Sequence, residues 1–199
     1  MSDQYKTLLK PSKEILFKER NSKFYGYAFP VENETQAKKF IEDLRKRNSK
    51  ANHVCFAWQL GIENPSFRVH DDGEPNNSAG SPIYGQIQSF EITNVLIAVV
   101  RYFGGTKLGV GGLIQAYRTT AQLALENSII VERTQEEYFS ITFQYAAMNS
   151  VMRIIKKYKL KIVSQSTDVA CNYVLAVRKT AAENIKSIFR NAMDIKLND

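Results

Sequence analysis

The chain has 199 residues, 44% of them hydrophobic and 24% charged, which is typical of a globular protein and excludes a disordered or fibrous one. Its 27 lysines and arginines outnumber its 20 aspartates and glutamates, and the resulting net charge of +7 is compatible with a polyanionic partner without requiring one. The longest strongly apolar run, VLIAVV, is far shorter than the roughly 20 residues of a membrane span. The first residues lack the apolar core of a signal peptide, so we expect a cytoplasmic protein with no membrane partner.

The first two thirds of the chain predict a mixture of strands and helices. Alternating apolar and polar residues over 13–31 predict a hairpin that turns at Glu19–Ser22. A helix should begin after Asn33, where Gln36 completes a capping-box pattern. The next elements expected are a strand over 53–61, a loop over 70–82, a short helix over 82–90 and a strand over 92–103. The last strand is apolar on both faces, which is typical of a central position in a sheet.

The last third of the chain predicts a second domain. Residues 131–138 are polar and mark a boundary, which gives domains 1–132 and 133–199. Beyond it, strands over 138–145, 161–166, 172–179 and 194–198 alternate with helices over 149–159 and 180–192. This order, βαββαβ, is the ferredoxin-like motif. The fold class expected is therefore α+β with two domains. The two cysteines, Cys55 and Cys171, lie in apolar runs and should be buried and reduced.

A glycine-rich stretch, RYFGGTKLGVGGLIQAYR, joins the predicted central strand to a helix. Neither the Walker A pattern nor G-x-G-x-x-G is present, which argues against a P-loop or Rossmann nucleotide site. Two interpretations stay open: the glycines only permit a tight turn, or their N–H groups and nearby cations bind an anion such as RNA phosphate. The candidate anion-binding residues are Arg101, Gly104, Gly105, Lys107, Gly109, Gly111, Gly112 and Arg118.

Three carboxylates, Asp71, Asp72 and Glu74, lie close together in the predicted loop. They could hold Mg²⁺, they could accept hydrogen bonds from backbone N–H groups in a turn, or one of them could pair with Arg101 or Lys107. No catalytic constellation is recognisable, so no catalytic residue is assigned and whether the protein is an enzyme stays open.

The first helix of the second predicted domain is strongly basic. Arg153, Lys156 and Lys157 share one face of it, opposite Val151 and Ile155. A solvated polar face explains this arrangement, and a secondary RNA-binding patch is the alternative.

Three segments in order, HVCFAWQLG, DDGEPNNSAGSPI and TNVLIAVVRYFGGTKLGVGGLIQAYR, resemble the Impact family, most closely its bacterial YigZ-type members. The resemblance covers roughly residues 23–127. It implies an N-terminal domain like the second domain of a small-subunit ribosomal protein and a C-terminal domain like the fifth domain of elongation factor G. Asn76, Asn77 and Ser81 replace the Ser-Gly and the arginine that the family usually has in the acidic loop.

The resemblance also implies a link to translation, because the eukaryotic relatives regulate it. The leading hypothesis is therefore a non-enzymatic protein that binds RNA or the ribosome, without sequence-specific DNA binding, and modulates translation. One alternative is a Mg²⁺-dependent enzyme that acts on a phosphorylated small molecule or nucleotide. The other is a protein-interaction module with a protein partner. No cofactor other than this optional Mg²⁺ is expected.

Overall fold

A computed structural model of the chain describes residues 3–198, which form two compact units. The first unit is Tyr5–Arg133. The second comprises residues 134–198 together with residues 3 and 4. The division therefore lies next to the boundary expected after residue 132. No helix among the described residues is long and apolar enough to cross a membrane.

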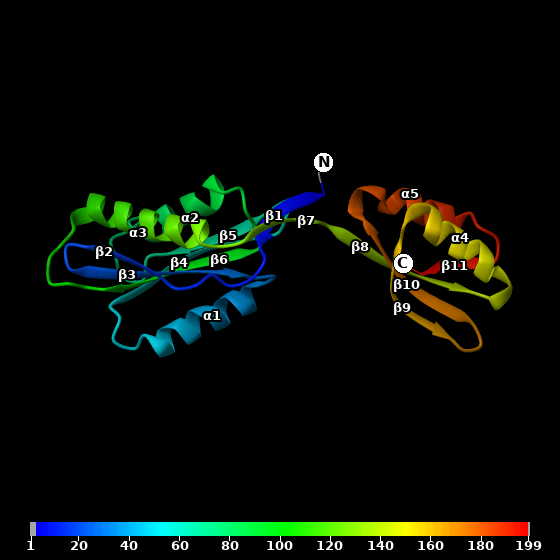
Figure 1. Ribbon diagram of the computed structural model, residues 1–199, viewed down its shortest axis with the longest axis horizontal. Coiled ribbons are helices and arrows are strands. Elements are labelled where there is room, and N and C mark those ends of the chain that lie inside the picture. Colours follow the sequence, from blue (N-terminus) through cyan, green and yellow to red (C-terminus); the bar gives the residue numbers. More distant parts are fainter. Residues whose placement is uncertain (1–2, 199) are drawn as a thin grey trace. The chain divides into compact units, whose positions relative to one another are not determined.

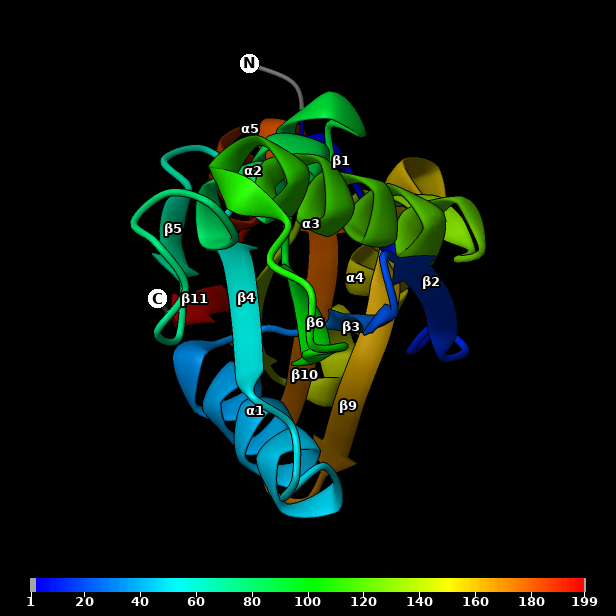
Figure 2. The same cartoon turned by 90° about the vertical axis from the view of Figure 1, so that its left-hand side faces the viewer.

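The first unit is built on a five-stranded antiparallel sheet in the order β2-β3-β6-β4-β5. Its strands are β2 (Ile15–Glu19), β3 (Ser22–Pro30), β4 (His53–Leu60), β5 (Ser66–His70) and β6 (Val95–Tyr102). The apolar strand β6 is central, as its sequence predicts. Helices α2 (Gly80–Ser89) and α3 (Gly109–Glu126) cover one face, and α1 (Glu34–Arg47) lies on the other (Figure 1, Figure 2).

The local sequence explains the first hairpin and the helix after it. Arg20 and Asn21 form the two-residue turn, both with positive φ, as a type I′ turn requires. Asn33 caps α1, because its side chain accepts a hydrogen bond from the backbone N–H of Gln36 at 2.9 Å. The Gln36 side chain accepts in turn from the backbone N–H of Glu32. Both predicted elements are confirmed.

Three strands in the first two thirds of the chain are absent from the sequence prediction. They are β5 and the two-stranded sheet of β1 (Gln4–Leu8) and β7 (Ile130–Thr134). The segment expected as a polar linker thus contains most of a paired strand. A further difference concerns the glycines: Gly109, Gly111 and Gly112 belong to the first turn of α3 and not to a loop before it.

Two apolar cores lie on the two faces of the sheet. The larger packs α2 and α3 against it and includes Phe24, Ile97 and Tyr117. The smaller packs α1 against it, with the rings of Phe29 and Phe40 stacked 4.4 Å apart. Both cysteines, Cys55 in this unit and Cys171 in the other, are buried and free, as expected.

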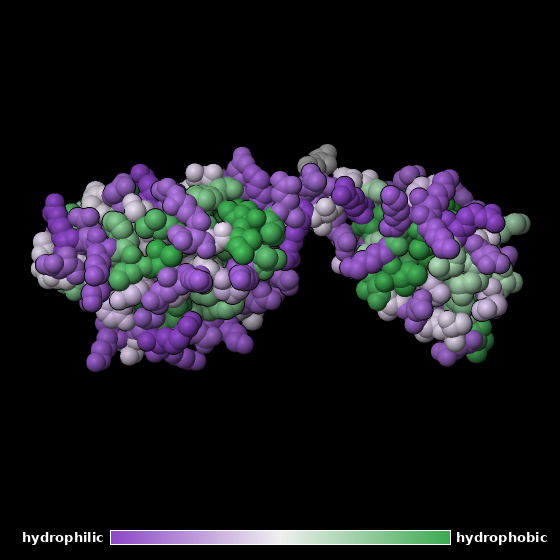
Figure 3. Space-filling model, viewed as in Figure 1, coloured by the Kyte–Doolittle hydropathy of each residue, from purple (hydrophilic) through white to green (hydrophobic). Residues whose placement is uncertain are grey.

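The second unit has the ferredoxin-like topology that its sequence predicts. The strands are β8 (Glu136–Phe143), β9 (Lys161–Thr167), β10 (Cys171–Arg178) and β11 (Ile195–Asn198), in the antiparallel order β11-β8-β10-β9. Helices α4 (Met148–Tyr158), preceded by the 3₁₀ turn η1 (Tyr145–Ala147), and α5 (Lys179–Arg190) share one core with the sheet. On each unit the visible surface is largely hydrophilic, with separate apolar patches (Figure 3). The protein is an α+β protein of two units.

Candidate functional site

The acidic loop before α2 is held by hydrogen bonds that its carboxylates accept from the surrounding backbone. Asp71 accepts from the N–H groups of Asn77, Ala79 and Gly80 at 2.8–2.9 Å, and these groups lie at the start of α2. A carboxylate at this place also interacts favourably with the positive end of the helix dipole. Asp72 accepts from the N–H of Val54 at 2.6 Å and pairs with Arg45 at 2.6 Å. These two carboxylates therefore fix the loop on β4, α1 and α2.

Glu74, the third carboxylate, lies inside the unit and is paired with Arg101. Its Oε1 accepts from Nη1 of Arg101 at 2.6 Å and from the Tyr117 hydroxyl at 2.7 Å. The thiol of Cys55 lies 3.3 Å from that hydroxyl, and Nε2 of His53 lies 3.8 Å from Glu74. Desolvation by burial raises the pKa of the Cys55 thiol and of the Tyr117 phenol, so both groups stay protonated.

This arrangement decides between the alternatives for the acidic loop. Asp71 and Asp72 accept hydrogen bonds in the turn, and Glu74 pairs with Arg101. The three carboxylates bind different partners, and among residues 3–198 no group of three His, Cys, Asp or Glu side chains could hold a metal ion. The three carboxylates of this loop therefore do not form a common set of ligands for Mg²⁺ in this structure.

Arg101 is buried, so its guanidinium is not accessible to an anion in solution or to a phosphate of the ribosome. Its side chain is 6% exposed, and its guanidinium lies about 5.4 Å from the ring centre of Phe24 and 5.5 Å from that of Phe103. Its Nε has no hydrogen-bond partner among the described residues. The expectation that Arg101 contacts phosphate is therefore corrected: its partner is Glu74, and the residue joins β6 to the acidic loop.

Most glycines of the glycine-rich stretch have a structural reason. A Cβ on Gly104 would lie 2.1 Å from the carbonyl carbon of Asn21, so this glycine lets the stretch pack on the turn of the β2–β3 hairpin. Gly105 and Gly109 have φ values of +87° and +73°, which favour glycine. A Cβ on Gly112 would meet that of Leu108 at 3.1 Å. A Cβ on Gly111 would meet nothing within 4 Å, so packing does not explain this glycine.

The outer side of the stretch combines exposed cations with an open helix end. Lys107 and Arg118 are exposed. No side chain caps the N-terminus of α3, so its first N–H groups are not occupied by a capping side chain. Gly111 and Arg118 are seven residues apart and lie on the same side of the helix. Of the predicted anion-binding set, the structure thus leaves Lys107, Arg118 and the exposed glycines of this helix end accessible.

The predicted basic patch of the second unit is also accessible. Arg153, Lys156 and Lys157 are exposed on α4, and the Lys157 ammonium lies 5.2 Å from the ring centre of Tyr158. These cations belong to the second unit, whereas α3 belongs to the first.

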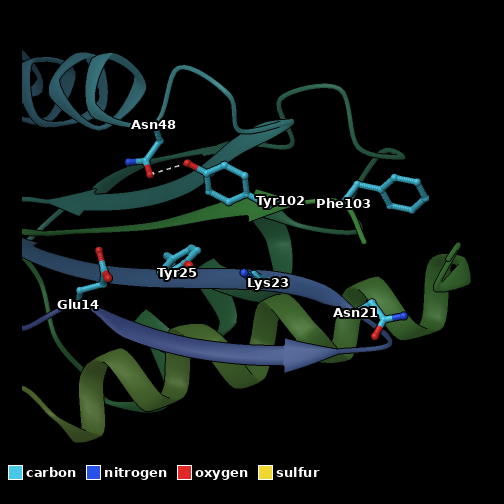
Figure 4. A pocket seen from close by; sticks show the side chains of 7 residues that line it. All are labelled: Glu14, Asn21, Lys23, Tyr25, Asn48, Tyr102 and Phe103. Carbon is cyan, nitrogen blue, oxygen red and sulfur yellow. Dashed lines mark hydrogen bonds between the residues drawn. The ribbon is translucent and has the colours of Figure 1, made fainter. Parts of the chain in front are cut away.

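The sequence interpretation missed a second surface, on the sheet face that carries α1. A cavity of about 470 Å³ opens there between β3, β6 and residues next to the ends of β2, β3, β6 and α1 (Figure 4). Its lining residues are Glu14, Asn21, Lys23, Tyr25, Asn48, Tyr102 and Phe103. The alternation of Lys23 and Tyr25 in a predicted strand was the available signal, but it does not show whether a helix covers that face.

Comparisons with known proteins agree with the motifs. Residues 20–125, more than half of the chain, match the Impact N-terminal domain. An IMPACT family member of Haemophilus influenzae is 31% identical over 186 residues, which cover 90% of this chain and 89% of the relative. The IMPACT family member YigZ of Escherichia coli is 28% identical over 166 residues, covering 82% and 80%. A crystal structure of a hypothetical protein covers 99% of this chain and 97% of its own, with a TM-score of 0.72 and 22% identity, which supports the fold. The chain belongs to the Impact family.

Proposed function

We propose that the protein is a cytoplasmic, non-enzymatic regulator of translation that binds RNA on the ribosome. The observation that carries the proposal is the exposed side of α3, where Lys107 precedes an uncapped first turn and Arg118 follows more than two turns further along the helix. Helix N-termini bind anions through their N–H groups and their dipole, and the two cations add a favourable field for phosphate. The resemblance to the Impact family links the protein to translation. The net charge of +7 agrees with a polyanionic partner.

The test is co-sedimentation of the purified protein with ribosomes and ribosomal subunits at low and high salt. We expect saturable binding that weakens with salt, and a clear loss in Lys107→Ala/Arg118→Ala. Lys38→Ala/Lys39→Ala is the matched control, since it removes two exposed charges from α1 and leaves α3 unchanged. Absence of binding at low salt, or equal losses in both double variants, would refute the α3 site.

The basic face of α4 is a second contact in this proposal. Arg153, Lys156 and Lys157 would add phosphate contacts from the other unit, and Lys156→Ala/Lys157→Ala should reduce ribosome binding and its salt dependence. The Mg²⁺-dependent enzyme has less support, because Asp71, Asp72 and Glu74 are occupied by protein partners. A thermal-shift series with nucleotides, with and without Mg²⁺, tests that alternative, since a bound ligand raises the melting temperature.

A further inference from the structure

Half of one sheet face in the first unit has no helix over it. A helix with its side chains is about 10 Å wide, and five strands spaced about 4.8 Å apart form a sheet about 20 Å wide. Helices α2 and α3 together cover one face, but α1 alone lies on the other (Figure 2). The cavity of about 470 Å³ lies on this second face, beyond the C-terminal end of α1, where Asn48 borders it.

The strand register arranges side chains in rows on this open face. Lys18 of β2 lies opposite Lys23 of β3, which lies opposite Tyr102 of β6. Residues paired in this way point to the same face, so two lysines and a tyrosine form one row across three strands. In the next row Leu16 lies opposite Tyr25. The ring centres of Tyr25 and Tyr102 are 5.8 Å apart, with the rings nearly perpendicular.

The cavity extends along these rows. Figure 4 shows Glu14 and Asn48 toward one end, Asn21 and Phe103 toward the other, and the two tyrosines with Lys23 between them. The Tyr102 hydroxyl donates to Asn48, which holds that ring in place. Glu14 accepts a hydrogen bond from Tyr27. The aromatic floor is therefore positioned by the protein before any ligand binds.

Protein stability does not explain the two opposed lysines. Like charges directly opposite each other on neighbouring strands destabilise a sheet, and the Lys18 and Lys23 side chains have no ion pair or hydrogen bond with other described residues. Lysine on an edge strand prevents pairing with other chains, which accounts for Lys18 on β2. It does not account for Lys23, because β3 lies inside the sheet. Leu16 and Phe103 add apolar surface, each 44% exposed.

We propose that this open face binds a single-stranded segment of RNA, with unpaired bases stacking on Tyr25, Tyr102 and Phe103. Lys18 and Lys23 would contact the phosphates beside the stacked bases. Single strands bind in this way to surfaces that combine aromatic platforms with cations, whereas the bases of a duplex are stacked on each other. The inference rests on the proposed RNA binding and adds where and in which form the RNA is recognised.

The position of Phe103 connects this face with the end of α3. Phe103 lines the cavity, and the residues that follow it, Gly104 to Thr106, lead to Lys107. A strand of RNA leaving the tyrosines past Phe103 would therefore meet the cations of the proposed ribosome contact. An extended protein segment is the other occupant that an aromatic groove accepts, but only an acidic one would pair with Lys18 and Lys23, whereas every RNA strand carries phosphates that can do so.

The experiment measures binding of fluorescently labelled single-stranded RNA of ten nucleotides to the full chain by anisotropy, with duplex RNA as comparison. Tyr102→Leu removes the ring and should weaken single-strand binding at least about fivefold, the lower value for loss of one stacked base. Tyr102→Phe keeps the ring and should retain affinity. Lys18→Ala/Lys23→Ala should flatten the dependence of log K on log salt by about 1.4, or about 0.7 for each phosphate of a single strand that the variant no longer neutralises.

A second readout locates the RNA directly. RNA that carries 4-thiouridine should form ultraviolet cross-links to peptides that contain Tyr25 or to those with Tyr102 and Phe103. Unchanged single-strand affinity in Tyr102→Leu and Lys18→Ala/Lys23→Ala, tighter binding of duplex, or cross-links confined to α3 would overturn the inference. Ribosome binding that depends on Lys107 and Arg118 but not on Tyr102 would overturn it while leaving the proposed function intact.

Discussion

The buried ion pair between Glu74 and Arg101 predicts a large loss of stability when only one charge is removed. The two side chains are 4% and 6% exposed, and breaking such a pair costs about 3–5 kcal/mol because the other charge stays buried. In Glu74→Gln the amide oxygen still accepts from Tyr117, so we expect the lower value, about 3 kcal/mol. Besides Glu74, the Arg101 guanidinium donates a long hydrogen bond, 3.4 Å, to the Ser22 hydroxyl, and its Nε has no partner among the described residues.

Urea unfolding followed by tryptophan fluorescence measures this loss in the first unit alone. The chain has one tryptophan, Trp58, which lies in β4 and is 5% exposed. With an m value of about 2 kcal/mol/M, a loss of about 3 kcal/mol lowers the urea midpoint by about 1.5 M. The double variant Glu74→Gln/Arg101→Met removes both charges and should regain most of the loss, to within about 1 kcal/mol of the original protein. A loss below about 1 kcal/mol in Glu74→Gln, or strictly additive effects, would refute the structural role of the pair.

Three further predictions use the same unfolding assay. Gly104→Ala should lower the free energy of unfolding by about 3 kcal/mol or prevent folding, since its Cβ would overlap the backbone of Asn21. Gly111→Ala places a Cβ where no atom lies within 4 Å and should raise the free energy of unfolding by about 0.5 kcal/mol. Equal effects of the two substitutions would contradict the packing at Gly104. Asn33→Ala removes the cap of α1 and should cost about 1 kcal/mol, and no change would argue against that cap. Because the pKa of Cys55 is raised in the folded protein, the unfolded chain loses the thiol proton first as pH rises. The free energy of unfolding should therefore be at its full value below about pH 8 and should fall above pH 9, by up to about 1.4 kcal/mol per pH unit. In Cys55→Ala the free energy of unfolding should fall less steeply with pH, and an identical slope would contradict the buried, protonated thiol.

The elements with strong local signals are those that the sequence predicts. The alternation around the first hairpin, the cap at Asn33 and the doubly apolar strand β6 each follow from a few neighbouring residues. The βαββαβ order of the second unit follows from six such segments. Strands β1, β5 and β7 have weaker patterns, because they lie at an edge or in a two-stranded sheet, and of their residues only Thr7 and Leu8 are buried. Their pairing is decided by distant residues.

The candidate site shows the same limit. The sequence identifies Arg101 as a residue that needs a partner, but the choice between phosphate and Glu74 depends on how the acidic loop folds over β4 and α3. The row Lys18–Lys23–Tyr102 is formed by three strands, two of them, β3 and β6, separated by about 65 residues of chain. Local periodicity indicates which side chains share a face of one strand, and the register between strands sets which of them lie together.

The central position of β6 has a consequence for folding during synthesis. Strands β3 and β4 both pair with β6, which follows them in the chain. Until residues 95–102 have been made, the hairpins β2–β3 and β4–β5 each carry an unpaired inner edge, the kind of edge that pairs with other chains. At about 5–20 residues per second, the roughly 65 residues between the end of β3 and the start of β6 take several seconds to synthesise. The nascent first unit is therefore most prone to aggregate in that interval, and a chain that stops before Val95 keeps both edges open.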